Sequence, residues 1–288
     1  MHQGDPHISR KQMAGAVLIT GGGSGMGRCM CRFFAERSWN VCIADINYKG
    51  AQRTAEEISS HLWDTPAKSF SVHKKQHKKG GLLAVKMDVC SSSQVRKTVE
   101  RCVKRFGRID ALVNNAGVTD QQTRNILDIP YDTLREIISI NVMGSFTCLR
   151  ECAAAMMKNS GGNIVNITSL LAQRGHARAG VAAYGMSKAA LEALTEYAAI
   201  ELAEEGINVN SAFPGVMVNT GFFDHLEEQQ RIKLADPTIM NELVYILCCL
   251  DPGSITGMSF SYQNWQKNPG LSRLYRRYLA DDTREGTT

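Results

Sequence analysis

Tyr184 and Lys188 are the residues of this chain whose types and spacing best suit acid–base chemistry. They stand four positions apart at the start of a predicted helix, so the phenol and the ammonium can share one face. A free tyrosine has a pKa near ~10, and a nearby cation favours phenolate and lowers that pKa. Tyr184 can then act as a general acid and base. The same spacing occurs in ordinary surface pairs, so the pair alone does not identify a site.

A glycine-rich turn predicts a second functional feature. The apolar run 16–20 has the composition of a buried parallel strand, and it leads directly into the glycines of 21–27 and a helical pattern. In this arrangement, backbone N–H groups and a helix N-terminus can bind a pyrophosphate. The next strand ends at Asp45, about 20 residues further on, where a carboxylate can accept hydrogen bonds from ribose hydroxyls. The alternative is an ordinary strand–helix turn in which Asp45 is a capping residue.

The elements that must hold these residues alternate along the chain. The pattern predicts strands at 15–20, 40–45, 82–87, 109–113, 163–168, 207–213 and 257–262, and helices at 25–38, 48–60, 92–106, 131–158, 184–205 and 238–250. Such alternation requires right-handed crossovers and a parallel sheet with helices on both faces. We therefore expect an α/β fold with a mainly parallel seven-stranded sheet. A single domain, 14–265, is expected between a flexible N-terminal tail, 1–13, and a C-terminal tail, 266–288.

With these motifs in place, the chain resembles the short-chain dehydrogenase/reductase family from about Ala14 to Met258. Segment 20–27 is similar to the family's glycine motif, and the Asn-Asn-Ala-Gly segment 114–117 to one that supports the central sheet and the cofactor. The resemblance implies a single Rossmann-type doubly wound domain that binds a nicotinamide dinucleotide. The cofactor-binding residues that it implies are Gly21, Ser24, Gly25, Met26, Gly27, Asp45, Asp88, Val89, Asn115, Ala116, Gly117, Tyr184, Lys188, Pro214, Gly215, Val218 and Thr220.

The same resemblance implies four catalytic residues. In the family, hydride passes between the nicotinamide ring and a carbonyl or carbinol carbon. Tyr184 would move the proton to or from the substrate oxygen, while Lys188 would lower the phenol's pKa and hold the nicotinamide ribose. Ser169 would stabilise charge on the substrate oxygen, and Asn141 would hold a water beside the lysine through its main chain. The implied function is an oxidoreductase that acts on a carbonyl or a secondary alcohol.

Two departures from the family pattern stand out. Ser169 and Tyr184 are fifteen residues apart, slightly further than is common, and the usual acidic, glycine-rich ending is replaced by 259–265. The rival function is a catalytically silent dinucleotide-binding regulator of the same fold, which the basic segment 66–81 and the altered ending favour. The complete catalytic set speaks against that rival.

Cofactor choice is predicted to favour NAD, with NADP less suited. Asp45 would repel a 2′-phosphate, and Ser24 stands where relatives that prefer NADP carry a basic residue.

Substrate choice is left open between two classes. An apolar pocket would suit a steroid, acyl or aromatic carbonyl, and its expected residues are Leu170, Leu171, Val216, Met217, Phe222 and Phe223. Basic residues in the same loop would instead attract an acidic group, and these are Arg174, His176 and Arg178. The segment 107–219 is most similar to 3-oxoacyl carrier-protein reductases and to sugar or polyol dehydrogenases.

The composition is that of an ordinary globular protein. The 288 residues are 43% apolar and 21% charged, and no stretch approaches the ~20 apolar residues that span a bilayer. The N-terminal residues lack the apolar core of a secretory signal. Nine cysteines without metal or scaffold spacing are expected to be buried reduced thiols. We therefore expect a cytoplasmic protein with no metal and no membrane partner, and the family resemblance implies a homodimer or homotetramer.

A basic segment, 66–81, accounts for much of the formal charge of +5. It contains five lysines and no acid, and His73 and His77 have a spacing that can hold a metal. We favour a solvated insertion between the second helix and the third strand, because it enters the amino end of that strand, whereas ligands bind at the carboxyl ends. Nucleic-acid binding through this segment is the less favoured alternative and predicts a strongly salt-dependent affinity.

Overall fold

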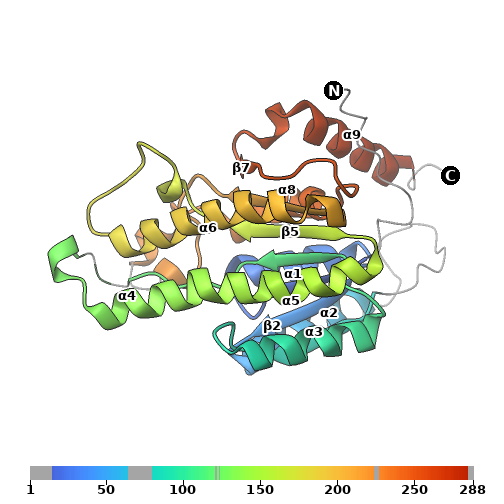
Figure 1. The fold of residues 1–288 in the computed structure, drawn as a ribbon, viewed down its shortest axis with the longest axis horizontal. Coiled ribbons are helices and arrows are strands. Elements are labelled where there is room, and N and C mark those ends of the chain that lie inside the picture. Colours follow the sequence, from blue (N-terminus) through green and yellow to red (C-terminus); the bar gives the residue numbers. More distant parts are fainter. Residues whose placement is uncertain (1–14, 64–79, 121, 123, 224–226, 285–288) are drawn as a thin grey trace.

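Seven parallel strands form the sheet at the centre of the molecule (Figure 1). This computed structural model describes residues 15–63, 80–120, 122, 124–223 and 227–284. The strands are β1 (Ala16–Thr20), β2 (Asn40–Asp45), β3 (Leu82–Lys86), β4 (Ala111–Asn114), β5 (Gly162–Ile167), β6 (Ile207–Phe213) and β7 (Ser259–Ser261). They lie in the order β3-β2-β1-β4-β5-β6-β7, and each neighbouring pair is parallel. The predicted α/β sheet is therefore confirmed.

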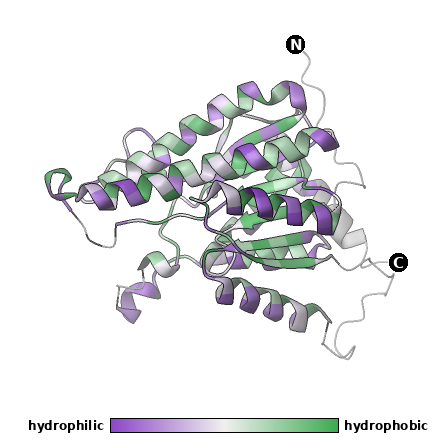
Figure 2. Cartoon of the chain, turned by 60° about the horizontal axis from the view of Figure 1, so that its bottom comes forward, coloured by the Kyte–Doolittle hydropathy of each residue, from purple (hydrophilic) through white to green (hydrophobic). Residues whose placement is uncertain are grey.

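Helices cover both faces of this sheet, as the sequence predicts. One face carries α1 (Gly25–Glu36), α2 (Tyr48–Trp63) and α8 (Asn241–Cys248), and the other carries α3 (Ser92–Phe106), α5 (Ser145–Met156) and α6 (Ala182–Glu201). Successive strand residues point to opposite faces, so in β1 Val17 and Ile19 join the first core and Leu18 the second. Figure 2 shows the result: the strands are mostly hydrophobic, and the helices turn hydrophilic residues outward.

The chain reverses its direction of winding between β1 and β4, which lie side by side at the centre of the sheet. In open parallel sheets, a ligand binds beyond the carboxyl ends of the strands at this switch point. Here the carboxyl ends bring together residues from distant parts of the sequence, including Thr20, Asp45, Asn114 and Ile167. The fold therefore places both sequence motifs at one edge of the sheet.

The helix predicted for 131–158 is confirmed as one uninterrupted helical run, but it is not α-helical throughout. It consists of α4 (Tyr131–Ile138), a π-helical segment (Ser139–Gly144) and α5, followed by a single 3-10 turn (Met157–Asn159). A π-helical turn keeps the helix axis and changes the hydrogen-bond spacing, so the apolar periodicity of the sequence does not reveal it. Such turns often occur at functional sites, and this one contains Asn141.

The C-terminal residues differ from the expected tail. After β7, a 3-10 turn (Trp265–Lys267) leads into helix α9 (Pro269–Arg284), and Leu271 and Leu274 of α9 are buried in the core that contains α8. Tyr275 packs edge-on against Trp265 at 5.1 Å between ring centroids, and its hydroxyl donates a 2.9 Å hydrogen bond to Glu242 of α8. Much of the expected tail is thus an amphipathic helix that packs on the domain, and the divergent segment 259–265 contains β7.

Shorter elements complete the fold, and some sequence predictions fall outside the described residues. The remaining helical turns are Ile126–Asp128, Leu170–Ala172, Ala203–Glu205, Gly221–Phe223, Glu228–Arg231 (α7) and Pro237–Met240. The N-terminal segment 1–13 and nearly all of the basic segment 66–81 lie outside the described residues.

Two further sequence predictions concern membrane-spanning segments and the state of the cysteines. Within the described ranges, no helix has the length and apolarity to cross a bilayer. All nine cysteines are free thiols, and the expectation of buried thiols holds for seven of them, whereas Cys29 is half-buried and Cys90 is exposed. Burial raises the pKa of the Cys148 thiol to about 12. A thiol with so high a pKa is chemically inert.

Candidate active site

Tyr184 and Lys188 lie one turn apart on α6 and face the carboxyl end of β5. Lys188 Nζ donates a 2.8 Å hydrogen bond to the carbonyl oxygen of Ile167, the last residue of β5. Ser169, two residues further along, shares a side-chain hydrogen bond with Tyr184. The structure therefore brings three of the four predicted catalytic side chains together at one point, where a strand end meets the first turns of a helix.

The environment of Tyr184 raises the pKa of its phenol to about 12. Burial is the main cause, because a phenolate loses its hydration there, and the Ser169 hydrogen bond opposes it. Lys188 Nζ stands 5.7 Å from the centroid of the tyrosine ring. Lys188 is not among the causes of this shift, so in this structure burial and Ser169 set the pKa of Tyr184. Tyr184 is therefore protonated at neutral pH and is poised to donate a proton.

Lys188 is itself buried, and this lowers its pKa to about 8. Desolvation of the ammonium is the main cause, and the negative charge of Glu192 opposes it. Near neutral pH the side chain is charged, and an ammonium has three N–H donors. The bond to Ile167 uses one of these donors. The others can bind the hydroxyl groups of a ligand in the adjoining cavity.

Asn141 lies behind this pair and does not line the cavity. Its side chain accepts a 2.8 Å hydrogen bond from Val118 N–H and donates to Val118 O and to Ser187 Oγ, each at 2.9 Å. Ser187 Oγ in turn donates a 2.7 Å bond to the carbonyl oxygen of Tyr184. Asn141 thus ties the π-helical segment to the loop after β4 and to the helical turn that carries Tyr184.

A cavity of about 650 Å³ opens at the carboxyl ends of the strands, beside Tyr184. Sixteen of the seventeen predicted cofactor-binding residues line it, and only Gly27 does not. A Cβ on Gly27 would overlap the carbonyl oxygen of Gly21, so this glycine lets α1 pack closely on the turn. Gly21 itself has φ +66°, a left-handed conformation that favours glycine.

The walls of the cavity fit a dinucleotide at its glycine-rich end. The turn 21–27 packs closely on its neighbours, because a Cβ on Gly22 would come within 2.9 Å of Ile43 and one on Gly23 within 2.9 Å of Asp45. Beside it, Thr20 Oγ1 accepts bonds from Asn115 N–H (3.0 Å) and Ala116 N–H (2.9 Å) and so holds the loop after β4 against the end of β1. The carboxylate of Asp45 accepts bonds from Gly23 N–H (2.9 Å) and Asn47 N–H (2.8 Å). Each carboxylate oxygen has further acceptor capacity, so Asp45 can also accept bonds from ribose hydroxyls.

The other end of the cavity is mainly apolar. Five of the six expected apolar residues line it: Leu170, Leu171, Val216, Met217 and Phe222. The side chain of the sixth, Phe223, lies outside the described part. Of the three basic loop residues, Arg178 lines the cavity, whereas Arg174 and His176 do not. The edge of the Phe222 ring packs against Tyr184 at 6.1 Å between centroids. This end therefore offers an apolar surface with one guanidinium.

Two side chains at this site have no recognisable sequence motif of their own. Ser187 links Asn141 to the backbone of Tyr184, and Glu192 accepts a 2.6 Å hydrogen bond from Thr168, the residue before Ser169. The signal that could have found Glu192 is its position four residues after Lys188, which places it on the same helical face. Among the described residues there is no cluster of potential metal ligands.

Comparisons with known proteins agree with this geometry. The family model for short chain dehydrogenases matches residues 15–231. A 3-oxoacyl-[acyl-carrier-protein] reductase of Staphylococcus aureus is 30% identical over 245 residues, which cover 82% of this chain and 91% of that protein. A sorbitol dehydrogenase of Cereibacter sphaeroides is 34% identical over 202 residues, 70% of each chain. A solved structure of a 3-ketoacyl-(acyl-carrier-protein) reductase of Brucella melitensis, complexed with NADH, has a TM-score of 0.71 and 27% identity, and the match covers 86% of this chain and 96% of that chain. The chain therefore belongs to the short-chain dehydrogenase/reductase family of oxidoreductases.

Proposed function

We propose that this protein transfers a hydride between NAD(H) and a carbonyl or secondary alcohol substrate, with Tyr184 as the general acid and base. The observation that carries the proposal is the convergence of Ser169, Tyr184 and Lys188 beside a cavity that the glycine-rich turn and Asp45 also line. A bound nicotinamide dinucleotide would supply or accept the hydride. The side chains of this chain would manage the proton and the charge on the substrate oxygen.

The residues divide this work as follows. In carbonyl reduction, Tyr184 donates its proton to the substrate oxygen while Ser169 donates a hydrogen bond to the same oxygen. Lys188 holds ribose hydroxyls with its remaining donors, and its charge stabilises the phenolate that forms. Asn141 acts indirectly: it donates to Ser187 in the helical turn that carries Tyr184, and its two bonds to Val118 hold that turn to the loop after β4. In alcohol oxidation, the same groups act in reverse, with phenolate as the base.

The preference for NAD is supported by charge at the adenosine end of the cavity. Asp45 stands there with both oxygens fixed by backbone N–H groups, and the basic residues that line the cavity, Arg178 and Lys188, belong to the substrate loop and α6. A 2′-phosphate would therefore meet a carboxylate there and, among the described residues, no lining cation. The Brucella melitensis relative with NADH is consistent with this choice. NADP is the less suited cofactor.

The apolar end of the cavity supports a carbonyl on an apolar chain or ring as the substrate. Leu170, Leu171 and Phe222 surround the approach to Tyr184. The two relatives are a 3-oxoacyl-[acyl-carrier-protein] reductase and a sorbitol dehydrogenase, which act on an acyl and a polyol substrate. The apolar wall favours the acyl type.

The free thiols support a cytoplasmic location, because disulfides are rare in cytosolic proteins.

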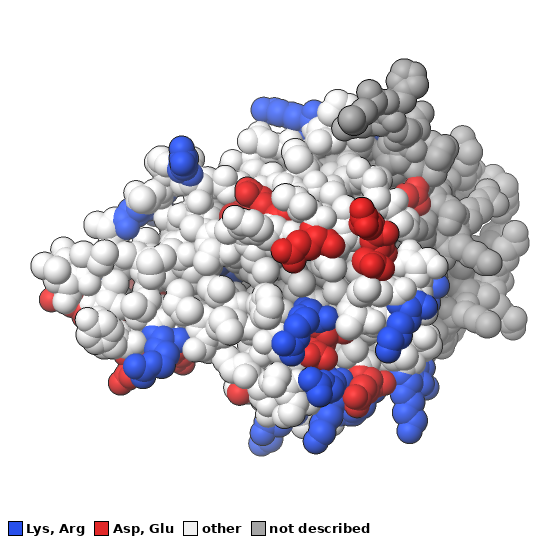
Figure 3. Space-filling view, viewed as in Figure 1, with Lys and Arg blue, Asp and Glu red and all other residues white. Residues whose placement is uncertain are grey.

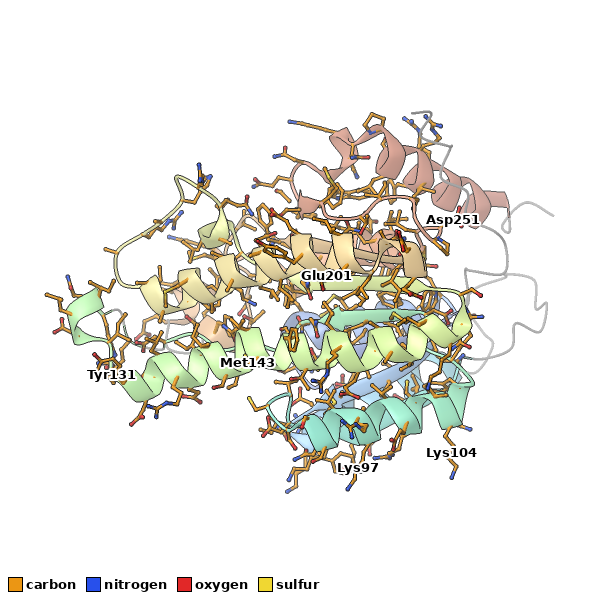
Figure 4. The ribbon with its side chains drawn as sticks, viewed as in Figure 1. Lys97, Lys104, Tyr131, Met143, Glu201 and Asp251 are labelled. Atoms are coloured by element: carbon orange, nitrogen blue, oxygen red, sulfur yellow. The ribbon has the colours of Figure 1, made fainter. Side chains whose placement is uncertain are left out.

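A homo-oligomer is supported by an exposed apolar surface on the face shown in Figure 3. Basic side chains gather there over α3 and acidic ones over α6, with largely uncharged surface between. Exposed large apolar side chains of the π-helical segment, α5 and α6 are Met143, Phe146, Met186, Tyr197 and Ile200. Met143 points outward in Figure 4. Exposed apolar surface of this kind marks an interaction site. The mixed charges of this described face give no support for nucleic-acid binding.

The experiment that tests the proposed function is a screen of ketones, 3-oxo esters and secondary alcohols. Cofactor absorbance at 340 nm would be followed with NADH and NAD, and in parallel with NADPH and NADP. We expect turnover with at least one carbonyl class and NADH. NADH binding without turnover of any substrate class would instead support the catalytically silent regulator.

A further inference from the structure

Glu192 of α6 accepts hydrogen bonds from side chains of four separate elements. Its Oε1 accepts from Thr168 Oγ1 (2.6 Å), Gln173 Nε2 (3.1 Å) and Ser259 Oγ (3.0 Å), and its Oε2 accepts from Ser211 Oγ (2.6 Å). These donors come from the end of β5, the loop beyond the turn 170–172, β7 and β6. All four donors are neutral, and an ionised carboxylate can only accept, so the set suits a charged Glu192. Hydrogen bonds to a charged group are stronger than neutral ones.

Two of these donors flank the segment that carries Ser169. Thr168 immediately precedes Ser169, Gln173 follows the turn 170–172, and both donate to the same carboxylate oxygen. Between these anchors, Leu170 and Leu171 line the cavity. One carboxylate therefore holds both ends of a segment that supplies a catalytic hydroxyl and part of the substrate wall.

Other hydrogen bonds attach the segment 168–173 to the sheet: Thr168 N–H donates to the carbonyl oxygen of Ala212 in β6 at 2.9 Å, and Gln173 Nε2 donates to Ser259 Oγ of β7 at 3.4 Å. Leu171 N–H donates to Ser169 Oγ at 3.2 Å, and the amides of Ala172 and Gln173 donate to carbonyl oxygens within the same turn, each at 3.0 Å. These bonds shape the turn but do not attach it to α6. The attachment to α6 comes from Glu192 and from the hydrogen bond between Ser169 and Tyr184.

We propose that Glu192 is a positioning residue that clamps the segment 168–173 to α6 and so places Ser169 against Tyr184. The clamp also reaches the divergent C-terminal part of the chain, because Ser259 of β7 donates to the same oxygen as Thr168. The consequence for catalysis rests on the proposed function, but the clamp itself does not. The two parts can therefore be tested separately.

Amide hydrogen exchange of the full chain, without cofactor or substrate, tests the clamp. Glu192→Ala should raise the exchange of the amides of 171–173 by roughly tenfold or more, the size expected for loss of a hydrogen bond to a charged group. Glu192→Gln keeps the shape and an acceptor for Thr168, so its increase should be much smaller. Glu196→Ala, on an exposed site one turn further along α6, is the matched control. Unchanged exchange in Glu192→Ala, or a uniform increase that includes the buried strand β1, would overturn the clamp.

Steady-state reduction of ethyl 3-oxobutanoate by NADH tests the consequence for catalysis. Glu192→Ala should lower kcat by roughly tenfold or more while the Kd for NADH, from fluorescence titration, changes less than about twofold. Glu192→Gln should recover most of the kcat. Wild-type kcat in Glu192→Ala, despite faster exchange of 171–173, would overturn the positioning role. A wild-type protein that does not turn over any carbonyl would refute the proposed function, and the exchange experiment would still decide the clamp.

Discussion

Lys188 Nζ donates a 2.8 Å hydrogen bond to the carbonyl oxygen of Ile167, and this bond joins α6 to the last residue of β5. The next two residues of the chain also bond to α6, Thr168 to Glu192 and Ser169 to Tyr184. Three consecutive residues thus pair with three successive turns of one helix. The hydrogen bonds between residues 167–169 and α6 therefore set the geometry of the site as much as any single catalytic side chain does.

Replacing Tyr184 with phenylalanine should remove turnover and leave cofactor binding nearly intact. Only the proton carrier is lost, because the ring and its packing against Phe222 remain. We expect kcat to fall by roughly a hundredfold or more, in line with the usual contribution of a general acid. Lys188→Ala should weaken NADH binding as well as turnover. Near-normal activity of Tyr184→Phe would refute the assignment of Tyr184.

The low pKa of Lys188 predicts how the use of NADH depends on pH. The group is charged below about pH 8 and loses its proton as the pH rises through that value. A neutral amine is a weaker donor to ribose hydroxyls, so kcat/KM for NADH should fall above about pH 8. Tyr184, with a pKa of about 12, stays protonated over this range and does not cause the fall.

The control for this profile is Lys188→Arg. Arginine keeps its charge at every accessible pH, so the decline near pH 8 should disappear even if the overall rate is lower. The measurement is kcat/KM for NADH between pH 6 and pH 10 at fixed ionic strength, a window of roughly two pH units on either side of the Lys188 pKa. A wild-type profile that is flat to pH 10 would mean that burial does not govern the titration of Lys188 in solution.

Much of the fold could be predicted because apolar periodicity and glycine turns are local signals. The seven strands and the cavity residues after β1, β4 and β6 follow from such signals. The π-helical segment around Asn141 could not be predicted, since its apolar pattern is that of an α-helix. The role of α9 depends on which surface Leu271 and Leu274 meet, and that surface is formed by distant α8.

The details of the site that sequence does not reveal are those that depend on burial and on distant partners. The Tyr184–Lys188 spacing correctly predicts a shared face, but the pKa of Tyr184 is set by desolvation, which no spacing reports. Glu192 receives donors from β5, β6 and β7, which are far apart in sequence. Such a cluster exists only after the sheet has formed.

The basic segment should be dispensable for the proposed activity. Replacing Lys68 through Lys79 with a short Gly/Ser linker should leave the Kd for NADH within about twofold and folding almost unchanged. The reason is topological: the segment enters the amino end of β3, opposite to the carboxyl ends that form the cavity. Loss of cofactor affinity would refute that placement. Loss of a nucleic-acid gel shift without loss of activity would instead support the nucleic-acid alternative.

The apolar surface of α6 predicts the position of a subunit interface. Ile200 is 76% exposed, and Ile200→Glu would place a charge in any apolar contact made there. We expect a wild-type mass above that of a monomer by sedimentation velocity, and a shift toward monomer in the variant. Ile232→Glu is the matched control, since Ile232 is 77% exposed beside α7. Dissociation by the control alone, or a monomeric wild-type protein, would contradict this interface.

Asp45 should determine which dinucleotide the protein uses. Its carboxylate lines the cavity and is held by Gly23 N–H and Asn47 N–H, so it cannot turn away from a 2′-phosphate without breaking both bonds. Like charges brought together across a binding interface cost several kcal/mol, and each ~1.4 kcal/mol is a tenfold factor. We therefore expect kcat/KM to be at least roughly a hundredfold higher with NADH than with NADPH.

The double variant Asp45→Ala with Ile46→Arg should reverse part of this preference. Ile46 is exposed and lines the same end of the cavity, so an arginine there can pair with the phosphate while the repelling carboxylate is gone. The variant should lose much of its efficiency with NADH and gain with NADPH. Ile46→Arg alone separates the two effects, because it adds the partner and keeps the repulsion. Equal kcat/KM of the wild-type protein with both cofactors would show that the carboxylate does not face the ribose, and the proposal of NAD preference would then be wrong.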